Sequence, residues 1–501
     1  MAAKVYHIRC PIHGLIPMNA WERKLIDSDV FQRLRRVRQL AWTDFVYPGA
    51  MHTRFEHSIG VMHVAGKLFD SIVQNSQEVL SELYGGSSDW IPREKQKVRL
   101  AALLHDVGHS PFSHASEELF PFKDTLRLTS GHLFPSEAPQ LKRYKHEDYS
   151  IALIKGPLRT EIESHELNNG IDITADHIAD LLQGGTAAGP TLLWREILSN
   201  QLDADRMDYL LRDSHHLGVR YGQYDLHRLV SSVCAFQYKS EEDPRLRVKI
   251  GVLKGGLHAA ESLIVARYSM FKQVYFHKTR TAYDIHLQHA MEELLPSGTF
   301  PLPDEHGLPE YLSWSDWKVQ GLLAEGKGGE HAERLLKRRH FRIAYASKDR
   351  FVPSNKQQTA FSLAVKEQKK LAFIKDALNG VCKEARTSKN NWYKGSSADI
   401  TVVDEVDRTQ LSPLSQFTSI AELNAQEQTL LYVAPEDVEK ARKIIADAVA
   451  AFDRLDNKKA AKKAPAKSSR KRSRKPPAID KKKPKSVTLN LEGKKEALDA
   501  K

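Results

Sequence analysis

An almost entirely apolar helix that ends in two ionisable side chains limits the folds open to this 501-residue chain. Residues 98–104 read Val-Arg-Leu-Ala-Ala-Leu-Leu, a pattern typical of a helix inside a core, and Gly108 and Pro111 then end it. His105 and Asp106 lie between, where burial is costly unless a partner compensates. Because imidazole and carboxylate both bind Fe, Mn, Zn or Mg, the pattern predicts a helical core with a metal site at this helix end.

Further histidines and acids surround this pair in the sequence. A single His-Asp adjacency is weak evidence, and Asp176-His177 opens a mainly polar segment that we interpret as a solvated helix start. The spacing of Asp205, Tyr209 and Asp213, four residues apart each time, places them on one helix face. A helix that only packed into the hydrophobic core would rarely carry two carboxylates and a phenol on one face. The remaining candidates are His57, His109, His114, Glu117, His146, Asp203 and Asp208.

The order His57, then His105-Asp106, then Asp205 resembles the signature of the HD superfamily of metal phosphohydrolases. Longer stretches are similar to its dNTP triphosphohydrolase branch, which includes bacterial dGTPase-like enzymes and the animal sterile-alpha-motif HD-domain dNTPase. The resemblance extends in order over roughly residues 6–290. The stretches that carry it are residues 31–40, 54–61, 105–114 and 203–218.

The resemblance implies a role for each matching residue. The implied metal ligands are His57, His105, Asp106 and Asp205, and the implied catalytic residues are His109, Glu117 and His146. The implied substrate-binding residues are Gln39, Leu40, Arg54, His114, Arg206, Tyr209 and Asp213. Arg54 and Arg206 would bind phosphate, and Leu40 would exclude a 2′-hydroxyl, so a deoxyribose is expected. Glu117 departs from the aspartate common in the animal enzyme, which alters its reach.

The implied reaction is metal-dependent hydrolysis of deoxynucleoside triphosphates to deoxynucleoside and inorganic triphosphate. The implied cofactors are one divalent transition metal (Fe, Mn or Zn) at the HD site and Mg with the triphosphate. One alternative is an HD phosphodiesterase, nucleotidase or single-strand nuclease, because all use such a metal centre. Another is a catalytically silent nucleotide sensor, although a pure binder has no need of His109 and His146.

Regulation and assembly also follow from the resemblance. The positions that match an allosteric pocket for an activating nucleotide are Asp27, Gln32, Arg35 and Arg228. The family's usual Asp-Pro-Ile-His-Gly reads Cys-Pro-Ile-His-Gly over residues 10–14, which puts this pocket in doubt. Relatives form dimers, tetramers or hexamers, so we expect a homo-oligomer.

The expected fold class is mainly α, with an HD-domain helical core, a smaller C-terminal α/β (α+β) unit and a disordered basic tail. Helical periodicity dominates from Pro17 to Leu295, and a Pro- and Gly-containing stretch follows. Beyond it, residues 341–345, 400–403 and 430–434 are strand-like, and residues 359–378 and 435–452 are helical. The expected divisions are a catalytic core over 1–295, a linker over 296–329, the C-terminal unit over 330–455 and the tail over 456–501.

The basic charge of the chain is concentrated in that tail. Residues 457–486 hold 14 of the 75 Lys and Arg residues and a single acid, so the rest of the chain is close to neutral despite the net charge of +12. We interpret the tail as a solvated terminus, with weak polyanion binding as the functional alternative. No apolar run approaches the roughly 18 residues that span a membrane, and no signal peptide is recognised. The expected location is cytoplasmic.

Overall fold

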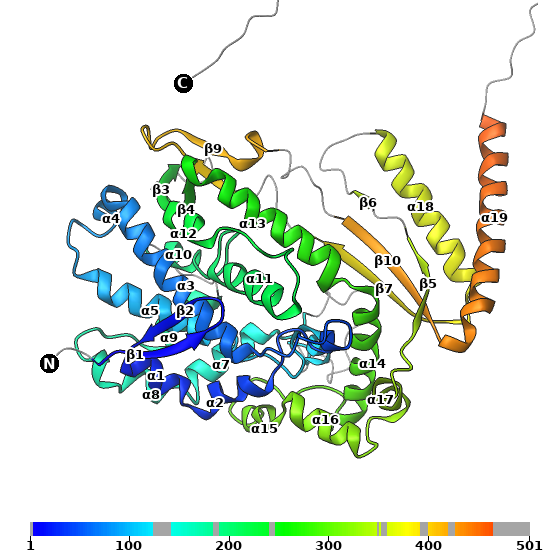
Figure 1. Cartoon of the computed structure of the whole chain (residues 1–501), viewed down its shortest axis with the longest axis horizontal. Coiled ribbons are helices and arrows are strands. Elements are labelled where there is room, and N and C mark those ends of the chain that lie inside the picture. The colour runs from blue at the N-terminus through cyan, green and yellow to red at the C-terminus, as the bar shows by residue number, and fades with distance from the viewer. Residues whose placement is uncertain are drawn as a thin grey trace, which may run out of the picture. The chain divides into compact units, whose positions relative to one another are not determined.

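The computed structural model describes residues 4–123, 142–183, 190–239, 246–347, 350–351, 358–390, 399–418 and 426–463. Helices make up most of it, so the predicted mainly α fold class is confirmed (Figure 1). The α-helices are α1 (Ala20–Ile26), α2 (Asp29–Gln32), α3 (Arg54–Asn75), α4 (Gln77–Leu83), α5 (Trp90–Leu104), α7 (His146–Lys155), α8 (Arg159–Glu163), α9 (Ala175–Gln183), α10 (Pro190–Arg195), α11 (Ala204–Leu217), α12 (Leu226–Ser232), α13 (Leu257–Met270), α14 (Lys278–Leu294), α15 (Leu308–Ser313), α16 (Asp316–Ala324), α17 (Gly329–Leu336), α18 (Gln358–Ala377) and α19 (Val438–Lys463).

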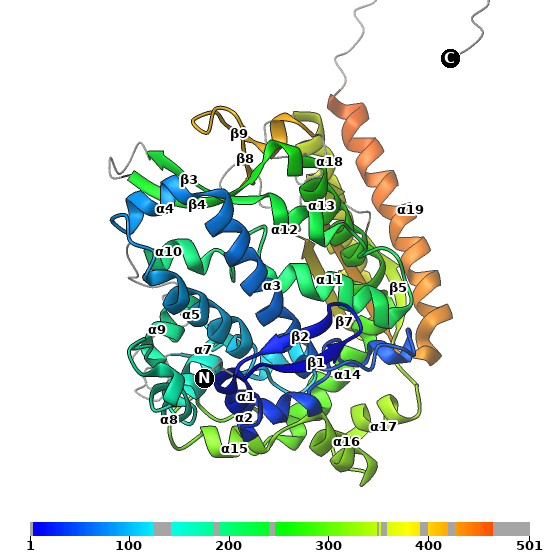
Figure 2. The same ribbon diagram turned by 60° about the vertical axis from the view of Figure 1, so that its left-hand side comes forward.

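Helices α3, α5 and α11 form the centre of the core, and both α5 and α11 pack against α3 (Figure 2). Thr53 and Glu56 form a capping box that fixes the start of α3, and Asp203 caps α11. Helix α5 is buried over Leu100–Leu104 and ends there, so His105 lies just past its last residue. The three helix ends therefore bring their ionisable residues together.

Two antiparallel hairpins lie where we predicted no strand, one at the start of the predicted helical stretch and one within it. They are β1 (Tyr6–Cys10) with β2 (Gly14–Met18), and β3 (Val233–Lys239) with β4 (Leu246–Leu253). The latter pair extends to β8 (Thr401–Val403) and β9 (Leu411–Pro413), in the order β3-β4-β8-β9. The predicted strand over 400–403 therefore exists but belongs to this sheet rather than to the C-terminal unit. Sequence patterns report a strand's faces and not its neighbours.

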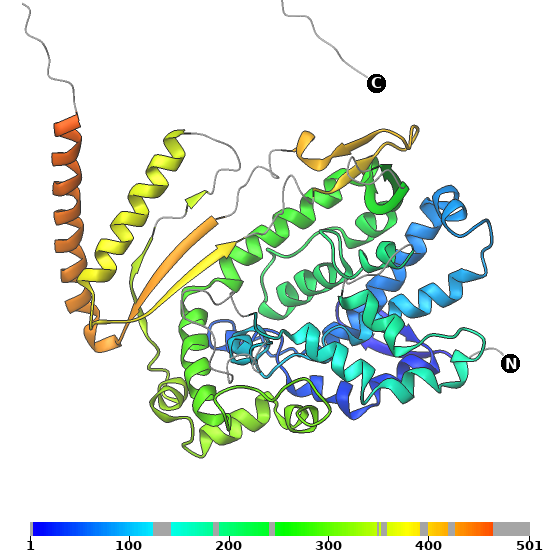
Figure 3. The same ribbon diagram turned by 180° about the vertical axis from the view of Figure 1, so that it is seen from behind.

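The second four-stranded sheet has helices on both faces (Figure 3). Its strands are β5 (Arg342–Ala346), β6 (Arg350–Phe351), β7 (Cys382–Asn390) and β10 (Gln426–Val433), with β10 pairing with the other three. Leu431 and Val433 of β10 pack with α18 and α19. Tyr432 points to the opposite face and packs with α14. This sheet is the α+β unit predicted from the sequence, with α14 of the core as one of its covers.

The segment over 296–329 is not a linker, which corrects our prediction. It contains α15 and α16, whose Tyr311, Val319 and Leu323 are fully buried in the main hydrophobic cluster. The Pro and Gly residues that suggested a linker separate and start short helices here instead. Helix α19 also continues to Lys463, so residues 456–463 are helical where a disordered tail was predicted, and residues 464–501 lie outside the described residues.

None of the described helices has both the length and the apolar character needed to cross a membrane.

A buried leucine of α16 tests whether this segment belongs to the core. Replacing Leu323, which is fully buried, with Ala should lower the free energy of unfolding by roughly 2–5 kcal/mol because it leaves a cavity. The same change at Leu336, which is 50% exposed at the end of α17, should cost less than about 0.5 kcal/mol. Urea denaturation followed by tryptophan fluorescence measures both. Equal costs would mean that 296–329 is not part of the core.

Candidate active site

The four predicted metal ligands meet where α3, α5 and α11 converge. His57 Nε2 lies 3.0 Å from Asp205 Oδ1 and 3.6 Å from Asp106 Oδ2. His105 Nε2 lies 3.2 Å from Asp106 Oδ1 and 3.8 Å from Asp205 Oδ1. The side chains of His57 and Asp106 are buried, whereas 37% of the Asp205 side chain is exposed. The structure thus brings the four predicted ligands together, and the group is accessible to solvent at Asp205.

A further buried carboxylate, Asp208, orients His57 from behind. His57 Nδ1 lies 2.8 Å from Asp208 Oδ2, and His13 Nε2 and the Arg212 guanidinium contact the same carboxylate. Burial alone would lower the pKa of His57, but hydrogen bonds to Asp205 and Asp208 outweigh it and raise the pKa to about 9. Gly60 is required on α3, since a Cβ there would lie 1.9 Å from Asp208. The sequence indicated that Asp208 lies near the site but did not predict this role.

The donor set fits a divalent metal. Ligand atoms of His57, His105 and Asp106 lie within 4.8 Å of one another. His105 Nδ1 is 2.8 Å from the carbonyl of Ala102, while its buried Nε2 makes no hydrogen bond to any described residue and is free to bind a cation. Burial opposes the ionisation of Asp106, but Arg54 and the neighbouring histidines hold its pKa well below the usual range. Two imidazoles and ionised carboxylates suit a transition metal.

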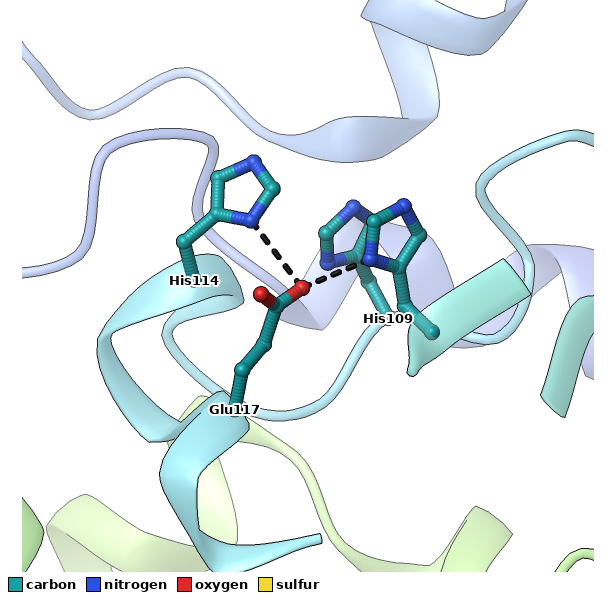
Figure 4. A group of neighbouring side chains, drawn as sticks. His109, His114 and Glu117 are labelled. Carbon is teal, nitrogen blue, oxygen red and sulfur yellow. Dashed lines mark hydrogen bonds and ion pairs between the residues drawn. The ribbon is translucent and has the colours of Figure 1, made fainter. Parts of the chain in front are cut away.

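The three predicted catalytic residues form a second cluster with His114 (Figure 4). Glu117 Oε1 lies 2.6 Å from His146 Nδ1 and 3.0 Å from His114 Nδ1. The rings of His109 and His146 stack, with centroids 3.8 Å apart. His109 Nε2 lies 3.3 Å from Asp106 Oδ1, which links this cluster to the metal-ligand candidates.

The pKa values of the two stacked histidines are shifted in opposite directions. Burial would lower the pKa of His146, but the hydrogen bond and charge of Glu117 raise it above its usual value. Burial, with Arg54 and His146 nearby, holds the pKa of His109 well below its usual value. The carboxylate beside His146 therefore favours the protonated form of that ring, whereas the surroundings of His109 favour its neutral form.

A cavity of about 360 Å³ opens beside these clusters. Its lining includes every predicted substrate-binding residue together with the metal-ligand candidate Asp205. Those residues are Gln39, Leu40, Arg54, His114, Arg206, Tyr209 and Asp213. The other wall of the cavity, which was not predicted from the sequence, comes from α13, the π-helical turn η6 (Phe271–Tyr275) and α14. The residues of that wall are Arg267, Phe271, Tyr275, Phe276 and Arg280, and only their aromatic and basic types hinted at a role.

The predicted phosphate-binding arginines are already paired with acids. Arg54 Nη1 lies 2.5 Å from Asp106 Oδ2 and its Nε donates to Ser113 Oγ at 2.9 Å. Arg206 pairs with Asp203 at the start of α11. Each carboxylate offsets the charge of the guanidinium that it contacts.

The predicted allosteric residues separate into two groups. Gln32 accepts a hydrogen bond from Arg35 at 2.8 Å, and the Arg35 guanidinium lies 3.5 Å from the centre of the Phe55 ring at the start of α3. Asp27 is close to them in sequence, at the end of α1. Arg228 lies on α12, whose Ser231 carbonyl accepts from Asn75 at the other end of α3. Within the described part of one chain, these residues do not form one pocket.

Comparison with protein families identifies the class. An HD domain matches residues 54–213, and the HD associated region matches residues 225–452. Residues 54–213 therefore form an HD domain, as predicted, and the His57, His105-Asp106 and Asp205 constellation lies within this match.

Individual relatives share about half of their length with this chain. It is 35% identical to an uncharacterised protein of Methanocaldococcus jannaschii over 57% of this chain and 49% of that protein. It is 34% identical to the deoxynucleoside triphosphate triphosphohydrolase SAMHD1 homolog of Dictyostelium discoideum over 56% of this chain and 48% of that protein. The crystal structure of a hypothetical protein from Aquifex aeolicus matches with a TM-score of 0.65 and 27% identity, covering 88% of this chain and all of that one.

Removing one ligand should abolish metal retention. We expect Asp106→Ala to weaken Mn²⁺ binding at least about 100-fold, the upper end of what loss of a supporting group costs a metal site. Titration calorimetry and the metal content of the purified protein measure this. The control is Asp176→Ala, which removes an exposed carboxylate that also adjoins a histidine and should leave binding unchanged. Unaltered Mn²⁺ affinity in Asp106→Ala would exclude the predicted ligand set.

Proposed function

We propose that this chain hydrolyses deoxynucleoside triphosphates to the deoxynucleoside and inorganic triphosphate. The observation that carries the proposal is the cavity, because all seven predicted substrate residues line it beside Asp205. The deoxynucleoside triphosphate triphosphohydrolase of Dictyostelium among the relatives supports the same substrate class. The HD domain supports a hydrolase, and the deoxynucleoside triphosphate substrate is our proposal.

The cavity suits a triphosphate because several cations line it. Arg54, Arg206 and Arg267 all line it, and a planar guanidinium can bind two phosphate oxygens at once. Arg54 and Arg206 exchange their present carboxylate partners for phosphate when the substrate binds. His57, His105, Asp106 and Asp205 would hold a divalent transition metal (Fe, Mn or Zn), which would act as a Lewis acid and lower the pKa of bound water, and Mg²⁺ would accompany the triphosphate.

Proton transfer is assigned to the Glu117 cluster. Glu117 raises the pKa of His146 and so favours the ring with protons on both nitrogens, and Nδ1 of that ring contacts the carboxylate. His146 therefore protonates the departing 5′ oxygen, and Glu117 stabilises the imidazolium before transfer. His109, neutral and stacked on His146, fixes the ring plane.

Recognition of the sugar is assigned to the opposite part of the cavity. Asp213 is held by His52 Nε2 at 2.8 Å and by the Tyr275 hydroxyl at 2.7 Å, so its carboxylate has a fixed orientation. Leu40 presents an apolar side chain to the same cavity and disfavours a polar 2′-hydroxyl. These contacts support a deoxyribose over a ribose.

An activating nucleotide, if bound by the predicted allosteric residues, requires more than one chain. Helix α3 separates Arg35 from Arg228 and, with 22 residues, is about 33 Å long. One nucleotide cannot contact both ends, so we propose that a second copy supplies Arg228. This supports a homo-oligomer as the active form.

Product analysis tests the proposed activity. Purified protein with Mn²⁺ or Mg²⁺ is incubated with each dNTP, with mixtures, with the matching NTPs and with a short single strand. We expect deoxynucleoside and inorganic triphosphate from dNTPs, at rates lowered more than about 10³-fold by Asp106→Ala. Cleavage of the strand alone would identify a nuclease, and no turnover of any substrate would identify a nucleotide sensor. Turnover confined to mixtures would indicate an activator.

Adjacent glutamates test the proton-transfer assignment. Glu117→Gln should lower kcat by roughly 10²-fold or more, because the pKa of His146 loses the support of the carboxylate. Glu118→Gln changes the next residue, whose 66% exposed side chain pairs with Arg386, and should alter kcat by less than about twofold. Steady-state kinetics at saturating dNTP compare the two. Equal effects would remove Glu117 from the reaction.

A further inference from the structure

One buried carboxylate joins two segments of the chain that line the cavity. Asp316, at the start of α16, is 1% exposed. Its Oδ1 accepts the backbone N–H of Phe112 at 2.8 Å, and its Oδ2 accepts the backbone N–H of Arg38 at 2.9 Å. Each oxygen of a single side chain therefore holds a different loop, and both loops are far from Asp316 in the sequence.

The residues that follow these two donors belong to the cavity. Gln39 and Leu40 come directly after Arg38, and Ser113 and His114 come directly after Phe112. All four line the cavity. The carboxylate of Asp316 therefore sets the distance between the residues assigned to the sugar and those beside the Glu117 cluster.

The backbone at Phe112 needs such a restraint. Phe112 and Ser113 both adopt the left-handed conformation, with φ of 59° and 56°, which costs free energy for residues other than glycine. Ser113 Oγ donates to the Arg38 carbonyl at 2.6 Å and accepts from Arg54 Nε at 2.9 Å. A shift of either loop would thus also move Arg54, which contacts Asp106.

Other contacts from the same segment restrain the preceding residues of the loop. Arg33 donates to the carbonyl of His109 and to that of Trp314, both at 2.9 Å. The Tyr311 hydroxyl donates to the carbonyl of Gly108 at 2.6 Å. The loop around Pro111 is therefore held on both sides of its turn. Of Arg33, Tyr311 and Asp316, Asp316 is the one that also accepts the backbone N–H of Arg38.

We infer that Asp316 is a positioning residue, which holds the two cavity-lining loops in register and acts on turnover through them. The inference rests on the proposed dNTP hydrolysis for its kinetic consequence. Asp316 and Arg38 both lie outside the residues that match the HD domain, so this restraint is added from elsewhere in the chain.

Ionisation of Asp316 controls the restraint. Burial raises the pKa of Asp316 to about 7, although both N–H donors oppose that rise. The cations that face Asp316 are Arg33 and Arg38, and Arg38 also pairs with Asp44. The nearby Lys318 ammonium lies over the ring of Trp314 instead. The ionised carboxylate accepts both N–H groups. Protonation turns one oxygen into a hydroxyl and leaves one N–H without a good acceptor, so the restraint weakens as the pH falls through about 7.

The test compares Asp316→Asn, which is isosteric and permanently neutral, with the unmodified chain. We expect kcat of the unmodified chain to fall on the acid side with a midpoint near pH 7. In Asp316→Asn this acid limb disappears, and kcat at pH 8 is about tenfold lower, the effect of one lost hydrogen bond to a charged group. The matched control is Glu196→Gln, because burial also raises the pKa of Glu196 to about 7. The residues that donate hydrogen bonds to Glu196 are Ile250 and Asn200, and neither lines the cavity. This variant should keep the acid limb.

Amide hydrogen exchange gives a readout that needs no turnover. At pH 8, the amides of Arg38 and Phe112 should exchange faster in Asp316→Asn than in the unmodified chain. Melting temperatures measured for both proteins establish that each is folded. In the unmodified chain, their protection, corrected for intrinsic rates, should decrease below pH 7. An acid limb retained in Asp316→Asn together with unchanged protection would overturn the inference. Absence of dNTP turnover in the unmodified chain would instead overturn the proposed function, and exchange alone would then decide the role of Asp316.

Discussion

Asp106, Asp205 and Asp208 are buried or half-buried around His57, at the point where α3, α5 and α11 meet. Three carboxylates in such a place repel one another, and each therefore depends on a cationic or hydrogen-bonding partner. His57 contacts all three, Arg54 pairs with Asp106, and Arg212 pairs with Asp208. The packing of the core helices depends on this network, because removal of any partner leaves an uncompensated buried charge.

The same network connects the metal-ligand candidates with the cluster that we propose for proton transfer. His105 Nε2 and His109 Nε2 both contact Oδ1 of Asp106, and the His109 ring stacks on the ring of His146. Glu117 acts on His146 without contacting the metal-ligand candidates directly. A charge change at one cluster therefore reaches the other through Asp106 and the stacked rings, over a short and buried route.

Segments outside the HD domain complete the site. The wall formed by η6 and α14 supplies Tyr275, which orients Asp213, and α16 supplies Asp316, which holds two loops. The left-handed residues Phe112 and Ser113 show that the loop after His109 is strained. Such a conformation persists only where surrounding contacts fix it, and these contacts come from residues far along the chain.

The sequence by itself determined the helical core, and it predicted which residues would lie together as metal-ligand and substrate-binding candidates, because each depends on local periodicity or on motifs that keep their spacing. It also predicted the C-terminal sheet with α18 and α19, whose patterns are regular. Only the tertiary structure decided that residues 296–329 pack into the core, that β8 joins β4, and that Asp316 meets Arg38 and Phe112. These are contacts between distant segments, and a single sequence encodes the chemistry of each partner without recording which partners meet in space.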